Sequence, residues 1–296
     1  MRVDLLCSGS KGNACLIQSG STRILIDCGP STKRYMKNSL QECGVEPEDL
    51  DAVLITHSHS DHIRQLAMFA KIPIYACCPL SVKNSKGEPV ALNLHPIKPP
   101  QPMRFGRLKV LSFPTSHDSG PSMGFVVEEM ADEHSSKVRD KLVYVTDTGY
   151  LPAAVFPLLS GAESYIFESN HDLEMLEKTR RPYSVKQRIV SDTGHLCNQD
   201  AARLLARFIS KKTRRIILAH LSEENNTPEL ALSALHEKLQ ACHIDCSKID
   251  IQAAAQWEPV RFETTPADPE KSEPEGASLQ ANEKPQELPV FYNEDR

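Results

Sequence analysis

The sequence contains no apolar run that approaches the ~20 residues a helix needs to cross a bilayer. Its first ten residues, MRVDLLCSGS, include too short an apolar stretch for a signal peptide. Nine cysteines, an odd number, are scattered along the chain, and we interpret them as reduced thiols. These absences exclude a membrane-spanning protein and predict a cytoplasmic one. The 296 residues suffice for one large domain or two small ones.

Net charge is also small, at −5, and it is unevenly distributed. Residues 263–296 hold 9 acidic and 3 basic side chains, whereas residues 1–262 carry a net charge of +1. The terminal segment is rich in proline and glutamate and poor in apolar residues, so burial cannot offset the entropy of ordering it. We therefore predict a single domain over 1–262 and a disordered acidic tail over 263–296. The tail ends near LPVFYN, a candidate docking motif for a protein partner, and a spacer without function is the alternative.

Short strand-like runs separated by turn residues dominate the first half of the domain. Strands are expected at 2–7, 14–19, 23–28, 51–56, 73–76, 107–113, 123–129, 142–146, 164–168 and 214–219. Helices are expected at 31–43, 61–71, 152–160, 183–190, 198–211 and 228–241. This order, mostly β, then β and α, then β and helix again, fits a layered α/β sandwich.

Three histidines and one aspartate fall within the seven residues THSHSDH, directly after the strand-like run DAVLI. In an extended loop, His57 and His59 lie two residues apart and point to the same side. If a helix begins just after them, Asp61 and His62 project from its first turn toward the same opening. Neutral imidazole and carboxylate groups are suitable ligands for zinc and related divalent ions. The motif therefore predicts a metal site, and four such groups could serve two metals.

Further candidate ligands each stand at the end of a strand-like run. They are Asp27 after ILI, His117 after VLSFPTS, Asp147 after KLVYVT and His220 after RIILA. Strand ends that converge on one edge of a sheet are where such a site can be assembled. Histidines that merely pack in the core are the alternative, but six of them would each need a separate explanation.

The segments LIDCG, THSHSDH, TSHDS, YVTDTG and LAHLSEENN, in this order, resemble the metallo-β-lactamase superfamily of hydrolases over about residues 1–260. The resemblance implies an α/β fold of the αββα four-layer sandwich type. It also implies a first metal held by His57, His59 and His117, a second held by Asp61, His62 and His220, and Asp147 as the bridge. Asp27 would orient a ligand through a hydrogen bond, so Asp27 and Asp61 are candidate catalytic residues. Zinc is the expected metal, with manganese or iron(II) as alternatives.

Two metals ~3.5–4 Å apart can share a hydroxide, because metal binding lowers the pKa of water from ~15.7 toward ~7. The expected chemistry is therefore hydrolysis with a metal-bridging hydroxide as nucleophile. The ligand motif alone suits esters, thioesters, amides and phosphodiesters equally. With an aspartate at the bridging position, the sequence resembles the phosphodiesterase and thioesterase branches of the superfamily. The helical substrate domain that usually follows in glyoxalase II-like thioesterases has no counterpart in the polar tail.

A basic segment favours a phosphodiester substrate. Residues 178–188 include five basic side chains and no acidic one, with Tyr183 among them. Basic residues beside an aromatic ring suit a phosphate backbone and a stacked base. We expect substrate contacts from Arg180, Arg181, Lys186 and Arg188. A solvated surface without function is the alternative.

The segment SDTGHLCN places His195 just before a helix that Asn198 is expected to cap. A helix N-terminus favours phosphate, and a histidine there could bind the scissile phosphate or protonate the leaving group. The pairing of GHLCN with AHLSEENN, together with SGSKGN and ESNHD, resembles the WalJ/YycJ-like branch of the superfamily. That branch is associated with 5′→3′ exonuclease activity on DNA. By this resemblance His195 is catalytic and contacts the substrate, and His171 has a secondary role in substrate binding.

The sequence thus predicts a two-metal-dependent phosphodiesterase, namely a 5′→3′ DNA exonuclease with DNA as its substrate. We expect it to act in the cytoplasm and not to bind a membrane. One alternative is a hydrolase of small thioesters or cyclic phosphodiesters. Another is a non-catalytic regulatory protein on the same fold. The intact ligand set argues against the regulatory protein, and the basic segment favours DNA over a small substrate.

Overall fold

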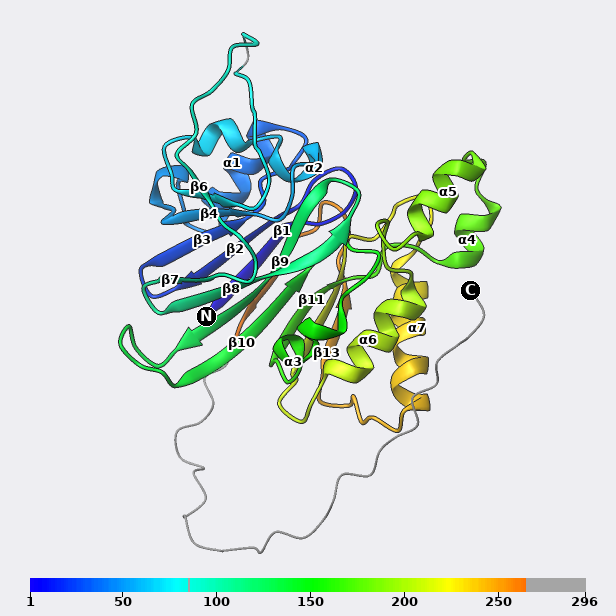
Figure 1. Ribbon diagram of the computed structural model, residues 1–296. Coiled ribbons are helices and arrows are strands. Elements are labelled where there is room, and N and C mark those ends of the chain that lie inside the picture. Colours follow the sequence, from blue (N-terminus) through cyan, green and yellow to red (C-terminus); the bar gives the residue numbers. More distant parts are fainter. Residues whose placement is uncertain (85, 265–296) are drawn as a thin grey trace, which may run out of the picture. The chain divides into compact units, whose positions relative to one another are not determined.

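The computed structural model describes residues 1–84 and 86–264, and two seven-stranded sheets form its frame (Figure 1). The first sheet has the order β14(Val260–Glu263), β1(Arg2–Cys7), β2(Ala14–Ser19), β3(Thr22–Ile26), β4(Ala52–Ile55), β5(Ile74–Ala76), β6(Leu94–Pro96). The second has the order β13(Asp250–Ala253), β12(Arg215–Ala219), β11(Ser164–Glu168), β10(Val138–Val145), β9(Gly120–Met130), β8(Leu108–His117), β7(Pro102–Phe105). The predicted strands are all present, and β6, β7, β13 and β14 were not anticipated.

Seven α-helices and three 3₁₀ helices accompany the sheets in the described part of the chain. They are α1(Lys33–Glu42), α2(Ser60–Ile63), α3(Phe156–Leu159), α4(Leu173–Lys178), α5(Tyr183–Val190), α6(Asn198–Phe208) and α7(Pro228–Ala241), with short 3₁₀ helices at Pro47–Asp49, Leu66–Phe69 and Ala153–Val155. One apolar core fills the space between the sheets. A second core joins one sheet to α1, and a third joins the other sheet to α6 and α7. These layers confirm the αββα sandwich.

Local sequence accounts for the helix starts. The Thr32 hydroxyl accepts a hydrogen bond from the backbone N–H of Tyr35 (3.1 Å) and caps α1. Thr227 does the same for the N–H of Leu230 (3.3 Å), and Pro228 occupies the first turn of α7. A threonine cap satisfies one of the backbone donors that a helix N-terminus leaves free.

The structure corrects four predicted boundaries. The helix expected over 61–71 splits into α2 and a 3₁₀ helix, because the N–H of Gln65 bonds the carbonyl of Cys28 (2.9 Å) in a neighbouring loop. The strand expected over 23–28 ends at Ile26, and the helix expected over 198–211 ends at Phe208. Glu263 and Thr264, at the start of the predicted tail, belong to the sheet edge, since the N–H of Thr264 bonds the carbonyl of Met1 (2.8 Å). Residues 265–296, including LPVFYN, lie outside the described part of the chain.

Strand direction determines where a site can form. β3, β4, β5 and β6 are parallel neighbours in one sheet, and β10, β11, β12 and β13 are parallel neighbours in the other. Parallel strands present their carboxyl ends at the same edge, where ligand sites of α/β proteins usually lie. Connecting loops at that edge of each sheet therefore hold the predicted ligands.

One buried carboxyl group in the second sheet lies outside this edge. Asp140 of β10 is only 2% exposed, and one of its carboxyl oxygens has no hydrogen-bond partner within the described residues. Burial, and then the nearby charge of Glu163, raises the pKa of Asp140 to about 6. The folded state therefore holds the proton more tightly than the unfolded chain, so ionisation destabilises the fold as the pH rises.

We expect Asp140→Asn to raise the free energy of unfolding at pH 8, by at most about 3 kcal/mol. Ionisation of the carboxyl group costs stability above the folded pKa, and asparagine does not ionise. The gain should shrink as the pH falls below about 6 and nearly vanish near pH 4. Urea unfolding across this range measures it, with the exposed Asp192→Asn as control. A gain that does not change with pH would mean that ionisation of Asp140 is not its cause.

Candidate metal centre and active site

All of the predicted ligands converge at one edge of the sandwich. The loop after β4 supplies His57 and His59, and α2 supplies Asp61 and His62. His117 is the last residue of β8, whereas Asp147 and His220 follow β10 and β12. Ligand atoms of these seven residues form overlapping groups in which each atom lies within 4.8 Å of the others in its group. The tertiary structure thus brings together residues that are up to 163 positions apart in the chain.

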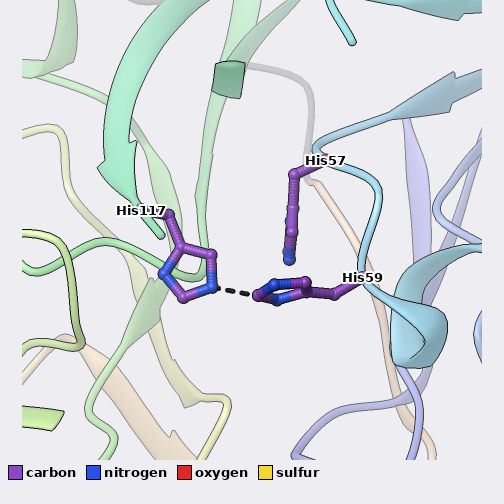
Figure 2. A group of neighbouring side chains, drawn as sticks. All are labelled: His57, His59 and His117. Carbon is purple, nitrogen blue, oxygen red and sulfur yellow. Dashed lines mark hydrogen bonds between the residues drawn. The ribbon is translucent and has the colours of Figure 1, made fainter. Parts of the chain in front are cut away.

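Three histidines form the first group, and Figure 2 shows their rings turned toward one another. Nε2 of His117 lies 3.2 Å from Nδ1 of His59. The ring centroids of His57 lie 4.8 Å from those of His59 and 4.9 Å from those of His117. His57 and His117 are buried, whereas His59 is partly exposed.

A second group consists of Asp61, His62 and His220. One carboxyl oxygen of Asp61 lies 3.6 Å from Nε2 of His62 and 4.0 Å from Nε2 of His220. Asp147 lies between this group and the histidine group. Its oxygens are 2.9 Å from Nε2 of His62, 3.5 Å from Nε2 of His220 and 3.6 Å from Nε2 of His117.

The backbone is strained just beyond the strand ends that carry some of these side chains. Within the described residues, only four non-glycine residues have a positive φ, and three of them are predicted site residues. They are Asp27 (φ 59°), Asp147 (φ 53°) and His220 (φ 54°), each just beyond the end of a strand. Such left-handed conformations cost of order 1–3 kcal/mol each and cluster at functional sites. Each side chain is thereby turned out of its strand and toward the metal centre.

Asp27 lies against His62, the position in which the resemblance implies that it would orient a ligand. Its carboxylate lies 2.8 Å from Nδ1 of His62 and accepts hydrogen bonds from the backbone N–H (2.9 Å) and the hydroxyl of Thr56. The Thr56 hydroxyl also lies 3.0 Å from Nδ1 of His57. Both histidines thus have Nδ1 engaged on the protein side, which directs Nε2 toward the centre of the cluster.

Loops from the first sheet close around Asp61 and His62. Nδ2 of Asn13 lies 2.9 Å from Nε2 of His62, and the N–H of Asn13 donates to the carbonyl of Asp61 (2.8 Å). Gly29 packs against the same peptide so closely that an added Cβ would lie 1.5 Å from the Asp61 carbonyl oxygen. Only glycine permits this approach. Asn13, the last residue of the loop SGSKGN, therefore helps to hold Asp61 and His62 in place at the metal centre.

The donor set fits a divalent metal ion. Nε2 of His57 and Nε2 of His220 are buried and make no hydrogen bond within the described residues, which is costly unless a ligand satisfies them. Burial, and then the neighbouring His62, lowers the pKa of His57 well below its usual value, so His57 is in the neutral form that coordinates metals.

The neighbouring carboxylates make this cluster attract positive charge. Burial alone would lower the pKa of His62, but Asp147, Asp27 and Asp61 together raise it well above its usual value. In the same way the pKa of His220 rises to about 10 against the effect of burial, chiefly through Asp147. These histidines therefore hold protons where no cation is bound, and a metal ion would replace those protons.

Glu168, at the end of β11, is a site residue that the sequence analysis missed. Its carboxylate is fully buried and lies 2.8 Å from Nδ1 of His195 and 3.0 Å from Nδ1 of His220. It also accepts a hydrogen bond from the N–H of Thr148 (2.8 Å). Burial would raise the pKa of Glu168, but His195 and His220 lower it to about 2. Two signals were available: its position at a strand end, which it shares with Asp147, and its place as the first residue of the segment ESNHD.

Asp118 was also missed, although it follows His117 directly. One of its oxygens lies 3.5 Å from Nε2 of both His59 and His117, and the other lies 2.9 Å from Nε of Arg188. Asp118 therefore links the first histidine group to α5. Its adjacency to a ligand could have indicated it, but the partner on α5 could not be inferred from the sequence.

His195 lies at the mouth of the metal centre. Its ring centroid is 5.0 Å from that of His117 and 5.3 Å from that of His220, and its Nδ1 is held by Glu168. The predicted cap is corrected, because α6 begins at Asn198 and Cys197 occupies the N-cap position. Asn198 instead hydrogen bonds Ser169 and Asn226 in a buried polar network.

A cavity of about 310 Å³ opens onto the metal centre. Its walls include His59, Asp61, His117, His195 and His220, together with Ser10, Asn170, Ser222 and Asn225, and side chains of α5 and the turn before it: Arg181, Val185, Arg188 and Ile189. Arg181 is held by Glu224, with N···O distances of 2.6 and 2.9 Å. Of the predicted substrate contacts, the structure brings Arg181, Arg188 and His195 to this cavity.

The other three predicted contacts lie elsewhere. His171 is buried behind the cavity wall, and burial, followed by His195, lowers its pKa to about 4. Lys186 is on the opposite face of α5, where its ammonium group contacts the carbonyl of Glu177. Arg180 is exposed in the turn between α4 and α5 and lines none of the cavities described here.

Comparison with known proteins identifies the class to which this fold and centre belong. Residues 22–221 match the family model of the beta-lactamase superfamily domain, and the chain belongs to that superfamily. The αββα sandwich is shared with the metallo-beta-lactamase fold protein YhfI from Bacillus subtilis, at a TM-score of 0.60 and 19% identity, over 88% of this chain and 98% of that one. With its cluster of histidines and carboxylates, the chain is a metal-dependent hydrolase.

Two relatives identify the branch. Exodeoxyribonuclease YycJ of Bacillus anthracis is 34% identical over 257 residues, which cover 81% of this chain and 89% of the relative. Exodeoxyribonuclease WalJ of Streptococcus pneumoniae is 36% identical over 237 residues, which cover 78% of this chain and 85% of the relative. The chain therefore belongs to the WalJ/YycJ-like branch. None of the helices in residues 1–84 and 86–264 combines the length and apolar character needed to cross a bilayer.

Proposed function

We propose that this protein is a two-metal-dependent DNA exonuclease that hydrolyses phosphodiester bonds in the 5′→3′ direction. The observation that carries the proposal is the seven-ligand cluster at the base of a cavity walled by two arginines. Arginine is well suited to bind phosphate, because its planar group donates two parallel hydrogen bonds. The names of the two relatives, both exodeoxyribonucleases, support DNA as the substrate. The cytoplasmic location belongs to the same proposal.

Two metal positions account for the arrangement of the ligands. His57, His59 and His117 would hold one ion, Asp61, His62 and His220 the other, and Asp147 would bridge them. Imidazole and carboxylate ligands favour zinc, and manganese and iron(II) accept the same set. When bound, such ions lower the pKa of water and stabilise negative charge that develops on a phosphate oxygen.

The protein's own residues would then position the substrate. Arg181 and Arg188 exchange their partners, Glu224 and Asp118, for phosphate oxygens, so that the strand lies along the wall of the cavity. His195 has Nδ1 engaged by Glu168, which leaves Nε2 as the nitrogen available to donate a proton to the leaving oxygen. Glu168 keeps the imidazole in that orientation and also fixes His220.

Asp27→Asn tests the two-metal assignment. Metal titration should find two ions per wild-type chain, and in the variant the ion at His62 should bind about 10- to 100-fold more weakly. The ion held by His57, His59 and His117 should keep most of its affinity, since its ligands do not contact Asp27. Circular dichroism checks that the variant is folded. A single ion per wild-type chain, or equal weakening of both ions, would contradict the assignment.

End-labelled DNA tests the reaction itself. With zinc or manganese, the wild-type protein should release mononucleotides progressively from the 5′ end of single- or double-stranded DNA. Asp61→Ala should abolish this release while the fold is retained, because Asp61 is a candidate ligand at a loop–helix junction and not part of the apolar core. Internal cuts, release from the 3′ end, or near-normal turnover by folded Asp61→Ala would each refute the corresponding part of the proposal.

Salt dependence tests the arginine contacts. Binding of a non-hydrolysable oligonucleotide to the double variant Arg181→Gln/Arg188→Gln should weaken, and its log–log salt dependence should flatten by about 0.7–0.9 per lost phosphate contact. Lys178→Gln is the matched control, since Lys178 pairs with Glu174 and does not line the cavity. If the double variant binds DNA as the wild type does, while a small phosphodiester such as bis-p-nitrophenyl phosphate is still cleaved, a small-substrate hydrolase becomes the better interpretation.

A further inference from the structure

The paired helices α4 and α5 project beside the metal centre and clear of both sheets (Figure 1). Two opposite faces of α5 line two different cavities. Arg188 and Ile189 lie on the face that walls the metal cavity. Tyr183, Lys186 and Val190 lie on the other face and line a separate groove of about 350 Å³. Positions 183, 186/187 and 190 are three or four residues apart, so they follow one side of the helix.

This second groove, hereafter the outer groove, is apolar and open. Its lining residues are Leu173, Leu176 and Glu177 of α4 and Tyr183, Lys186, Gln187 and Val190 of α5. Tyr183 is 75% exposed, Leu173 47% and Val190 44%. Six large apolar side chains are exposed in the described residues, and three of the six, Leu173, Tyr183 and Val190, lie on this one helical hairpin. Apolar side chains gathered in this way mark a binding surface.

The charge around the outer groove limits what can occupy it. Residues 173–190 carry five basic and two acidic side chains, a net charge of +3, although Arg181 and Arg188 line the metal cavity and Lys178 pairs with Glu174. Lys186 lines the groove, with its ammonium group against the carbonyl of Glu177, and Arg180 is exposed at the turn just before α5. An exposed aromatic ring flanked by cations is the arrangement that binds single-stranded nucleic acid, because bases stack on the ring while the cations neutralise phosphates.

We propose that the outer groove is an exosite that stacks an unpaired base of a DNA strand on Tyr183. The strand then crosses α5, with phosphates near Arg181 and Arg188, and presents its end to the metal centre. This inference rests on the proposed nuclease function, since it concerns the same substrate. On this proposal, the DNA strand runs along α5 from the outer groove to the metal cavity. Strands long enough to reach both cavities gain affinity from the exosite, and dinucleotides do not.

Three variants of one residue test the stacking. Tyr183→Ala should weaken the affinity for an oligothymidylate longer than the ~4–16 nucleotides of a typical binding groove by about 5- to 150-fold. Tyr183→Phe keeps the ring and should restore wild-type affinity within about threefold. Leu230→Ala removes an exposed apolar side chain on α7 and is the matched control for surface truncation. For hydrolysis, the ratio of the KM values for the long strand and a dinucleotide should change in Tyr183→Ala alone.

Tyr183→Trp reports the contact directly. The chain has one tryptophan, Trp257, whose emission in the wild-type protein is the baseline. A phosphorothioate oligothymidylate, which resists hydrolysis, should quench the added tryptophan in proportion to binding. Emission that is already quenched without DNA, and that recovers when residues 265–296 are removed, would mean that this terminal segment occupies the groove. Emission that changes only with protein concentration would indicate a second copy. Either outcome overturns the exosite.

The two proposals can fail separately. If no DNA is hydrolysed but Tyr183→Trp is quenched and Tyr183→Ala binds weakly, the exosite stands and the nuclease assignment is wrong. If DNA is hydrolysed from its 5′ end and Tyr183→Ala behaves as Leu230→Ala does on long strands, the exosite is wrong and the nuclease assignment stands.

Discussion

The carboxylate of Asp147 is the interaction on which this site depends. It is buried, and its oxygens lie 2.9 to 3.6 Å from imidazole nitrogens of His62, His117 and His220, which come from three distant segments and both sheets. A buried carboxylate requires positive charge nearby, and the imidazoles hold the pKa of Asp147 well below its usual value against the effect of burial. A metal pair would meet the same requirement. The strained backbone at the strand ends and the close packing of Gly29 serve this one arrangement.

The candidate metal ligands and the proposed substrate contacts lie on different parts of the fold. The ligands stand at the ends of strands, where two packed sheets hold them in place, and the buried partners Asp27 and Glu168 orient them. The basic and aromatic residues stand on α4 and α5, which pack on neither sheet as α1, α6 and α7 do. Rigid elements suit a reaction that depends on positioning, whereas an exposed hairpin suits a flexible polymer. If the proposed contacts on α5 are right, changes in α5 would alter substrate choice while the metal centre is preserved.

Sequence patterns succeeded where a residue's role depends on its neighbours in the chain. The ligand motif lies within seven residues, the helix starts at Thr32 and Thr227 follow local capping rules, and ten of the fourteen strands of the described residues follow strand-like runs. They failed where a role depends on a contact between distant segments. Glu168 and Asn13 resemble ordinary strand-end and turn residues until the fold places them against His195 and His62. The predicted helix over 61–71 was interrupted by a hydrogen bond from another loop, which no local pattern encodes.

The sequence by itself determined the chemical class of the protein, because imidazole and carboxylate groups at strand ends suit metal ions whatever the details of packing. The order of strand-like and helical runs also indicated a layered α/β sandwich, and the resemblance to the superfamily implied its two sheets. Only the tertiary structure decided which basic residues face the candidate metal centre. Arg181 and Arg188 line the metal cavity, while Lys186 lines the outer groove, although all belong to one basic segment. The reason is geometric: a helix distributes a continuous charge run around its axis, and only packing selects the side that faces the site.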